Sequence, residues 1–184
     1  MRWFLVAASL LTSSAFAEPG THEVLLGATS ISYSSFLRST PDHLALELSY
    51  QQPAGTQGPW RLVRIGGGVR ATFPDQVTHV PLEAFVTARL GAQWGPWEPM
   101  AGPELGVTGL SRLVPALTFP ESTVRRYEDA TVGPFYLAFG AEPLRFHFGN
   151  FSASAFGFHL GASAFPLGTA LRIQVEFIRV GFSL

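Results

Sequence analysis

The residues with the clearest potential for chemistry lie in the last quarter of the chain. They are His147, Ser152, Ser154, His159 and Ser163. Serine, histidine and a carboxylate can cleave an ester together, because the histidine takes the serine proton while the carboxylate orients the histidine ring. Glu142 or Glu176 could supply that carboxylate. A lipid hydrolase is therefore one alternative for the function.

The spacing of this set argues against catalysis. Polar residues at alternate positions of one strand step along its axis and do not converge on a nucleophile. The chain has no G-x-S-x-G, H-E-x-x-H, P-loop or dinucleotide-binding motif, and its five histidines lack the ligand spacing of a zinc site. We predict that the protein is not an enzyme and that it uses no metal or cofactor.

A second set of residues is defined by charge and by a period of two. In Leu44-Ala-Leu-Glu-Leu-Ser-Tyr50, the leucines and the tyrosine share one face, while Glu47 and Ser49 share the other. Such alternation is typical of a strand with one apolar surface. Nine charged residues occupy the polar faces of such stretches: Glu47, Arg64, Arg70, Glu83, Arg89, Glu104, Glu142, Arg172 and Glu176. An arginine facing lipid at mid-membrane would cost about 2–4 kcal/mol. We therefore predict that these nine residues form an ion-pair network in the lumen of a barrel.

Eight stretches of the chain carry this strand pattern. They are residues 22–32, 43–51, 61–73, 82–94, 98–110, 133–142, 151–164 and 170–184. Most of them match the roughly 9–11 residues of a tilted membrane strand. No later segment reads as a transmembrane helix, since Arg, Glu, Gly and Pro interrupt every apolar run. The prediction is an all-β fold, an eight-stranded antiparallel up-and-down transmembrane β-barrel.

The predicted connections differ at the two ends of this barrel. Loops 33–42, 74–81 and 111–132 would face outward, whereas 52–60 and 95–97 would lie on the periplasmic side. Short periplasmic turns and longer outer loops are typical of outer-membrane barrels. The longest loop contains four charged residues and a tyrosine that could contact lipopolysaccharide or a partner: Arg125, Arg126, Tyr127, Glu128 and Asp129.

Aromatic residues gather at the predicted strand ends, where rings form girdles at the headgroup level. They are Trp60, Phe73, Trp94, Trp97, Phe135, Phe151 and Phe165. The last strand alternates Val180, Phe182 and Leu184 to the terminus, and its change of phase near Phe177-Ile178 requires a bulge.

The N-terminal residues 1–17 read as a secretory signal peptide. Arg2 gives a positive start, an apolar run follows, and Ala15-Phe16-Ala17 provides a small-x-small cleavage pattern. The 184-residue chain has no cysteine and a net charge of −1, so it offers neither disulfides nor a basic field for nucleic acid. We expect one domain, residues 18–184.

With this pattern, the chain resembles the small bacterial outer-membrane β-barrel proteins of the eight-stranded OmpA, OmpX and OmpW type. The resemblance covers residues 18–184 and includes a C-terminal strand like the signal read by the barrel-assembly machinery, although the chain ends on Leu184 rather than Phe. It implies an outer-membrane location in a Gram-negative bacterium, contact with outer-membrane lipid, and a structural or surface-binding role.

Two alternatives use the same alternation differently. In a soluble periplasmic barrel that binds a lipid, the apolar face would point inward and the charges outward. In a small-solute channel or a barrel-embedded lipid hydrolase, the orientation would stay and the lumen or wall would act on a substrate.

Overall fold

The computed structural model describes residues 22–34, 43–72, 82–108, 135–165 and 168–184. Within these ranges most residues lie in strands. The strands are β1 (Glu23–Ser34), β2 (His43–Pro53), β3 (Val63–Thr72), β4 (Leu82–Gly91), β5 (Met100–Val107), β6 (Phe135–Glu142), β7 (Leu144–Phe148), β8 (Phe151–Phe165) and β9 (Gly168–Ser183). A short 3₁₀ helix, η1 (Gly58–Leu62), precedes β3. The predicted signal peptide and the five loop residues from Arg125 to Asp129 lie outside the described residues.

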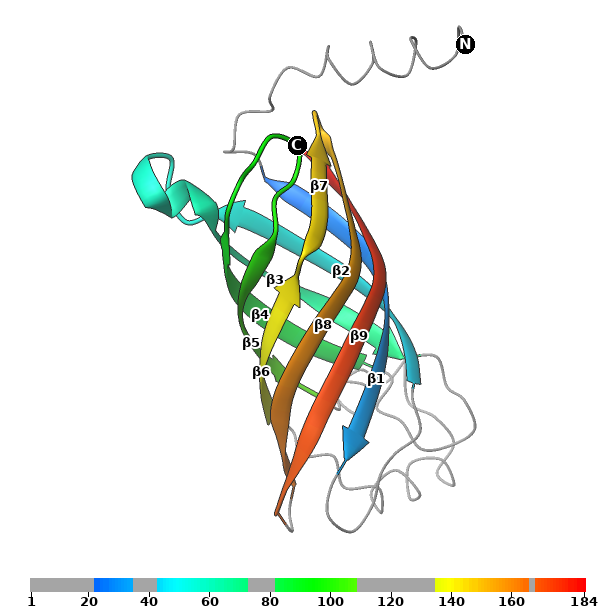
Figure 1. Ribbon diagram of the computed structural model, residues 1–184. Helices are drawn as coiled ribbons and strands as arrows, with labels where there is room; N and C mark the ends of the chain where they lie inside the picture. The colour runs from blue at the N-terminus through cyan, green and yellow to red at the C-terminus, as the bar shows by residue number, and fades with distance from the viewer. Residues whose placement is uncertain (1–21, 35–42, 73–81, 109–134, 166–167) are drawn as a thin grey trace, which may run out of the picture.

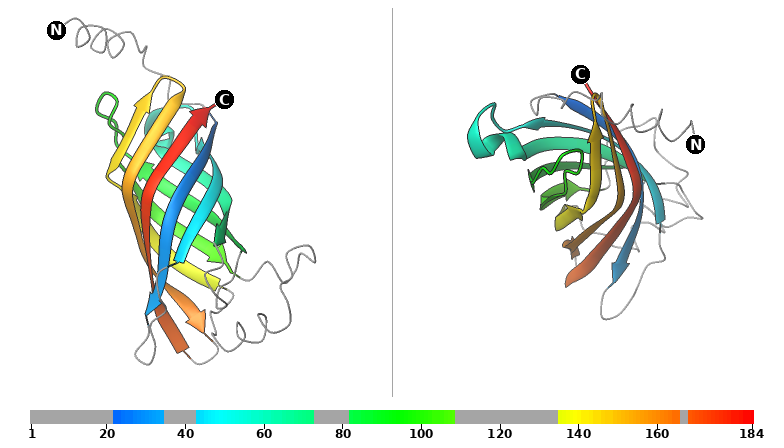
Figure 2. Two further views of the ribbon diagram at one scale, coloured as in Figure 1. Left: turned by 90° about the vertical axis from the view of Figure 1, so that its right-hand side faces the viewer. Right: turned by 45° about the horizontal axis from the view of Figure 1, so that its top comes forward.

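The strands close into a barrel. Each pairs antiparallel with its neighbours in the order β6-β5-β4-β3-β2-β1-β9-β8, and β6 also pairs with β8. β7 pairs with β8 as well and continues the wall position of β6 beyond Pro143, so the barrel has eight wall positions. Figures 1 and 2 show the strands tilted around a common axis. The predicted eight-stranded antiparallel barrel is confirmed.

Strand β7 is the main departure from the predicted elements, because residues 144–148 were expected in a connection. Pro143 has no N–H for the ladder and interrupts the strand, which disguises its continuation in the sequence. A second irregularity lies beside it: Phe156 on β8 has φ +55°, although it is not a glycine. The bulge expected near Phe177-Ile178 is present, since the pairing of β9 with β1 shifts register there and both side chains are exposed.

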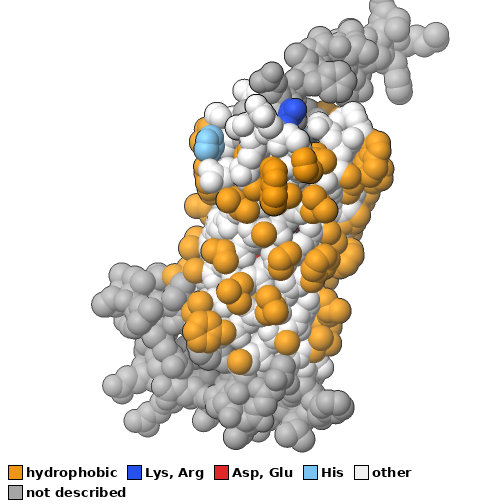
Figure 3. Space-filling view, turned by 90° about the vertical axis from the view of Figure 1, so that its left-hand side faces the viewer, with side chains coloured by type: hydrophobic (Ala, Val, Ile, Leu, Met, Phe, Trp, Pro, Cys, Tyr) orange, Lys and Arg blue, Asp and Glu red, His pale blue; other side chains and the backbone are white. Residues whose placement is uncertain are grey.

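Burial in this barrel is reversed relative to a soluble globular domain. Leu137, Val86 and Phe139 are 58–59% exposed on the outer surface, whereas Arg70 and Glu142 are 0% exposed in the interior. Figure 3 shows hydrophobic side chains spread over the middle of one face. Most of the few buried apolar residues form two small clusters, one around Ile31 and Tyr33 and one around Phe85 and Tyr136. No helix within the described residues is long and apolar enough to cross a membrane.

Candidate functional site in the barrel lumen

Arg70 on β3 organises the first part of the lumen network. The register places it directly between Glu47 of β2 and Glu83 of β4, because all three side chains point inward from neighbouring strands. Its guanidinium lies 2.7 Å from Glu47 Oε2 and 3.2 Å from both Glu83 Oε2 and Glu104 Oε1. Its positive charge also lies 4.3 Å from the centre of the Phe85 ring. One fully buried cation is thus neutralised by three carboxylates.

Arg172 on β9 closes this part of the network from the opposite wall. It donates two hydrogen bonds of 2.8 Å to the two carboxylate oxygens of Glu83. This bidentate geometry fixes the orientation of a guanidinium better than a single contact does. The guanidinium also donates to the Tyr33 hydroxyl and lies 3.9 Å from the centre of the Tyr136 ring. Strands β1, β4, β6 and β9 are thereby joined across the barrel.

Arg179 forms the centre of a second part of the network. It lies 2.7 Å from Glu47, 2.5 Å from Glu142 and 2.6 Å from Glu176. Arg89 joins the same group through Glu142 and, at 3.7 Å, through Glu104. Gly157 leaves the space that this crowding needs, because a Cβ there would lie 3.1 Å from the Cβ of Glu176.

A third part of the network lies at the end of the lumen that carries η1. Glu23, fully buried, is 2.5 Å from Arg145 Nη2, accepts a 2.5 Å hydrogen bond from Gln51, and accepts another from Ser152. Glu98 follows β4 in the turn region, and its carboxylate lies 3.1 Å from Arg64 Nη2.

Glu98 also binds His147, at 3.3 Å between Oε2 and Nδ1. Burial would raise the pKa of the Glu98 carboxyl, but the hydrogen bond with His147 and the charges of Arg145 and Arg64 outweigh burial and lower this pKa from 4.5 to about 2. Glu98 is therefore ionised throughout the physiological pH range.

The structure places all nine predicted lumen residues inside the barrel, each in at least one ion pair. It adds four charged residues that the sequence analysis did not include: Glu23, Glu98, Arg145 and Arg179. The strand pattern did not identify Arg145 because it did not identify β7. It did not identify Glu98 because this residue lies in a turn, where side chains do not alternate with a period of two. For Arg179 a signal existed, since the bulge at Phe177-Ile178 reverses which of the following residues face inward.

The candidate hydrolase residues lie apart from one another, and several of them contact glutamates of the lumen network. Ser152 donates to Glu23, Ser154 donates to Glu176 at 3.1 Å, and His159 Nδ1 lies 3.0 Å from Glu104 Oε2. Ser163 is fully buried. These contacts join walls of the barrel and do not assemble a nucleophile with its base.

Another serine comes closer to a triad arrangement. Ser183 Oγ lies 3.5 Å from Nε2 of His147, and Nδ1 of the same histidine ring contacts Glu98. Both backbone N–H groups beside this hydroxyl are already bonded, that of Ser183 to Asn150 and that of Leu184 to His22. These two N–H groups are therefore not free to stabilise an oxyanion there. Among the described residues, no cluster of His, Cys, Asp or Glu side chains could hold a metal ion.

Side chains are packed closely around the arginines of the network. A small cavity beside Glu47, Arg89 and Arg179 has room for about one water molecule. Arg70, Arg145 and Arg172 are 0% exposed, so other parts of the barrel cover these three side chains completely. An eight-stranded barrel has an interior that side chains can just fill. The arrangement joins the walls of the barrel across the lumen at these levels.

The comparisons with known proteins agree at the level of the fold. No family model matches the chain, and no curated protein matches its sequence. The crystal structure of Neisserial surface protein A, NspA, is similar with a TM-score of 0.57 and 10% identity, over 89% of this chain and 97% of that one. Ail, the attachment invasion locus protein of Yersinia pestis, is similar with a TM-score of 0.45 and 12% identity, over 90% of this chain and 99% of that one.

NspA and Ail are small eight-stranded outer-membrane barrels. At this identity, the likeness to NspA shows a shared fold. The resemblance to this class that the strand pattern predicts is confirmed.

Proposed function

We propose that the protein is an outer-membrane β-barrel with a structural or surface-binding role and a lumen closed by its Arg/Glu network. The observation that carries this proposal is the reversed burial. Leucine, valine and phenylalanine side chains cover the outside of the strands, and six arginines with seven glutamates fill the inside. An apolar outer band around a polar interior is the arrangement of transmembrane barrels.

The same observation disfavours the soluble lipid-binding alternative. That reading requires the apolar faces to line an internal cavity, whereas Leu44, Leu46 and Leu48 point outward and are 44–57% exposed. In water, an exposed apolar surface of this extent would drive aggregation. A hydrocarbon environment removes that penalty.

The filled lumen supports a closed barrel over a solute channel. We further propose that the loops at the end opposite η1, including Arg125–Asp129, face outward and meet lipopolysaccharide or a surface partner. The final strand β9, with Val180 and Phe182 on its outer face and Leu184 directly after it, would be the segment that the barrel-assembly machinery reads. Export would depend on the signal peptide at residues 1–17.

The deciding experiment is fractionation of cells that express the chain, followed by gel electrophoresis of the detergent-extracted protein with and without boiling. We expect the protein in the outer-membrane pellet and a change of mobility on boiling, since a closed barrel migrates as a compact species until it unfolds. A freely soluble periplasmic protein with no change would refute the proposal. Reconstitution in planar bilayers tests closure, and a stable large conductance would show that the lumen is open.

A further inference from the structure

The connection between β2 and β3 is built unlike a tight barrel turn. The backbone N–H of Ala54 donates to the carbonyl of Val63 at 2.7 Å, which extends the hairpin beyond the strands. The chain between these two residues then forms η1 and returns. Figure 1 and the right view of Figure 2 show this segment projecting sideways from the rim, outside the barrel wall.

The segment 54–62 is held in a defined shape. Gly58, just before Pro59, has φ +62°, which favours glycine. Gly55 lies against the start of the next turn, because a Cβ there would be 2.9 Å from the Cβ of Trp60. This close approach folds the segment back on itself and fixes where Trp60 emerges.

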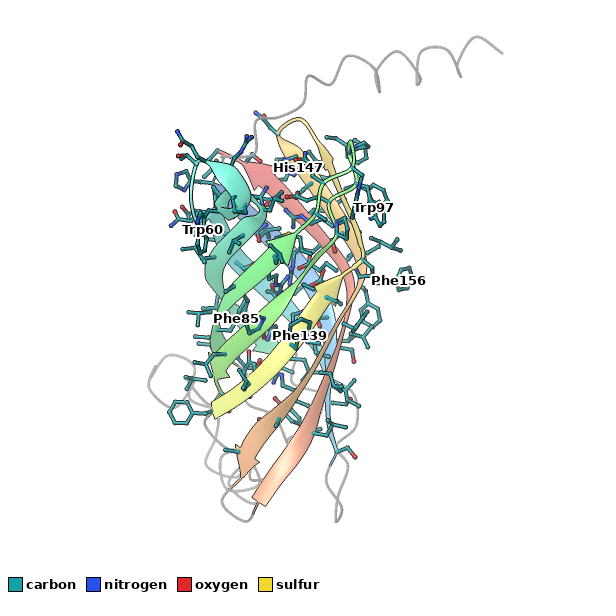
Figure 4. All side chains as sticks on the ribbon, turned by 60° about the vertical axis from the view of Figure 1, so that its left-hand side comes forward. Trp60, Phe85, Trp97, Phe139, His147 and Phe156 are labelled. Carbon is teal, nitrogen blue, oxygen red and sulfur yellow. The ribbon has the colours of Figure 1, made fainter. Side chains whose placement is uncertain are left out.

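Trp60 is the most conspicuous side chain of this segment. It is 62% exposed, and Figure 4 shows it outside the barrel wall. Residues 54–60 carry no charge, and Arg61 is the one charged residue of the segment 54–62. On the adjacent wall the apolar band continues with Tyr50 and Ile65, which are 39% and 40% exposed.

A tryptophan in this position suits the boundary between hydrocarbon and headgroups. Its ring is amphipathic, with a large apolar face and one N–H donor, and such rings concentrate at membrane interfaces. The uncharged residues 54–59 are compatible with the headgroup layer, and the positive charge of Arg61 can interact with lipid phosphates. Trp60 is exposed at the end of the barrel where this apolar band ends, so we expect the lipid that covers the band to cover the exposed face of Trp60 as well.

We propose that residues 54–62 form an interfacial foot, a segment that lies on the headgroup layer of the membrane leaflet at this end of the barrel with Trp60 inserted among the lipids. This inference rests on the proposed membrane location. The foot stands on one side only. Trp97 lies at the same end of the barrel on the opposite side in Figure 4, so the two tryptophans together mark the membrane boundary.

The test uses the tryptophans of the full chain, which are Trp3, Trp60, Trp94 and Trp97. The variant W3F/W94F/W97F reports on Trp60 alone, and W3F/W60F reports on Trp94 and Trp97. Both are reconstituted into phosphatidylcholine vesicles whose acyl chains carry bromine at shallow or deep positions, and the loss of tryptophan emission is measured. Mobility on unboiled gels verifies that each variant has closed its barrel.

We expect shallow bromines to quench Trp60 more than deep ones, to an extent similar to Trp94 and Trp97. If Trp94 and Trp97 are quenched and Trp60 is not, the barrel is inserted but its foot stands in water, and this inference is overturned while the proposed function survives. If none of the three is quenched although both barrels have closed, the membrane location itself is wrong. Quenching of Trp60 mainly by deep bromines would place it in the apolar band and also overturn the foot.

Discussion

The outer wall and the lumen of this barrel are made by the same strands, yet they obey opposite rules. Val69 and Arg70 are neighbours on β3; the first is 42% exposed on the outer surface and the second is 0% exposed among three carboxylates. On the wall each side chain contributes apolar area independently. In the lumen each charge depends on partners from other strands, because an unpaired buried charge is costly. The wall should therefore tolerate substitution within a chemical class, and the lumen should not.

The largest expected effect is the loss of Arg70. Arg70→Met leaves Glu47, Glu83 and Glu104 short of a counter-charge, and removing one partner of a buried ion pair costs about 3–5 kcal/mol. The temperature at which the unboiled gel form unfolds should fall markedly. Val69→Met, one position away on the wall, is the matched control and should change this temperature little. Equal effects at the two positions would contradict the division between wall and lumen.

A charge on the wall should have the next largest effect. Leu137 is 59% exposed on β6, and an arginine at mid-membrane costs about 2–4 kcal/mol. Leu137→Arg should therefore reduce the fraction of protein that assembles into the outer membrane, measured by fractionation. Leu137→Phe should assemble normally, because phenylalanine is already common on this wall. Normal assembly of the arginine variant would mean that residue 137 does not face lipid.

Glu98 tests the lumen network through pH. Its pKa is about 2 in the folded protein against an ordinary 4.5, so its ionised form contributes stability above pH 4.5, and that contribution is lost as the pH falls toward 2. Glu98→Gln should lower stability at pH 7. The difference between wild type and variant should shrink between pH 4.5 and pH 2 in urea unfolding. A difference that stays constant over that interval would show that the charge of Glu98 does not act in this way.

The smallest expected effect on stability concerns the hydrogen bond between Trp97 and Pro143. The indole Nε1 of Trp97 donates to the Pro143 carbonyl at 2.7 Å, beside the break between β6 and β7. Trp97→Phe keeps an aromatic ring and removes this donor, which should cost about 0.5–1.5 kcal/mol. Trp94→Phe is the control at the other end of the same turn. If both variants lose the same stability, the hydrogen bond to Pro143 is not the cause.

The fold could be predicted from the sequence because its signal is local. A period of two on each strand assigns every residue to the wall or the lumen, as Leu44 to Tyr50 illustrates. The sequence could not predict which charged residues pair within the lumen. These ion pairs depend on how the tilted strands bring residues that are distant in sequence to the same height along the barrel axis. Glu47, for example, meets Arg179 across 132 positions. Pro143 and the bulge at Phe177-Ile178 hid Arg145 and Arg179, since each breaks the period on which the assignment rests.

The pairing of β1 with β9 has a consequence for how the molecule is made. Glu23 lies opposite Ser183, so β1, which is synthesised before the other described strands, pairs with β9, which is synthesised after them. A product that lacks β9 cannot make this pairing and leaves the edges of β1 and β8 unpaired beside an apolar outer surface. The polypeptide must therefore be protected from aggregation until β9 has paired with β1. Synthesis that stops before β9 should give a product that is degraded.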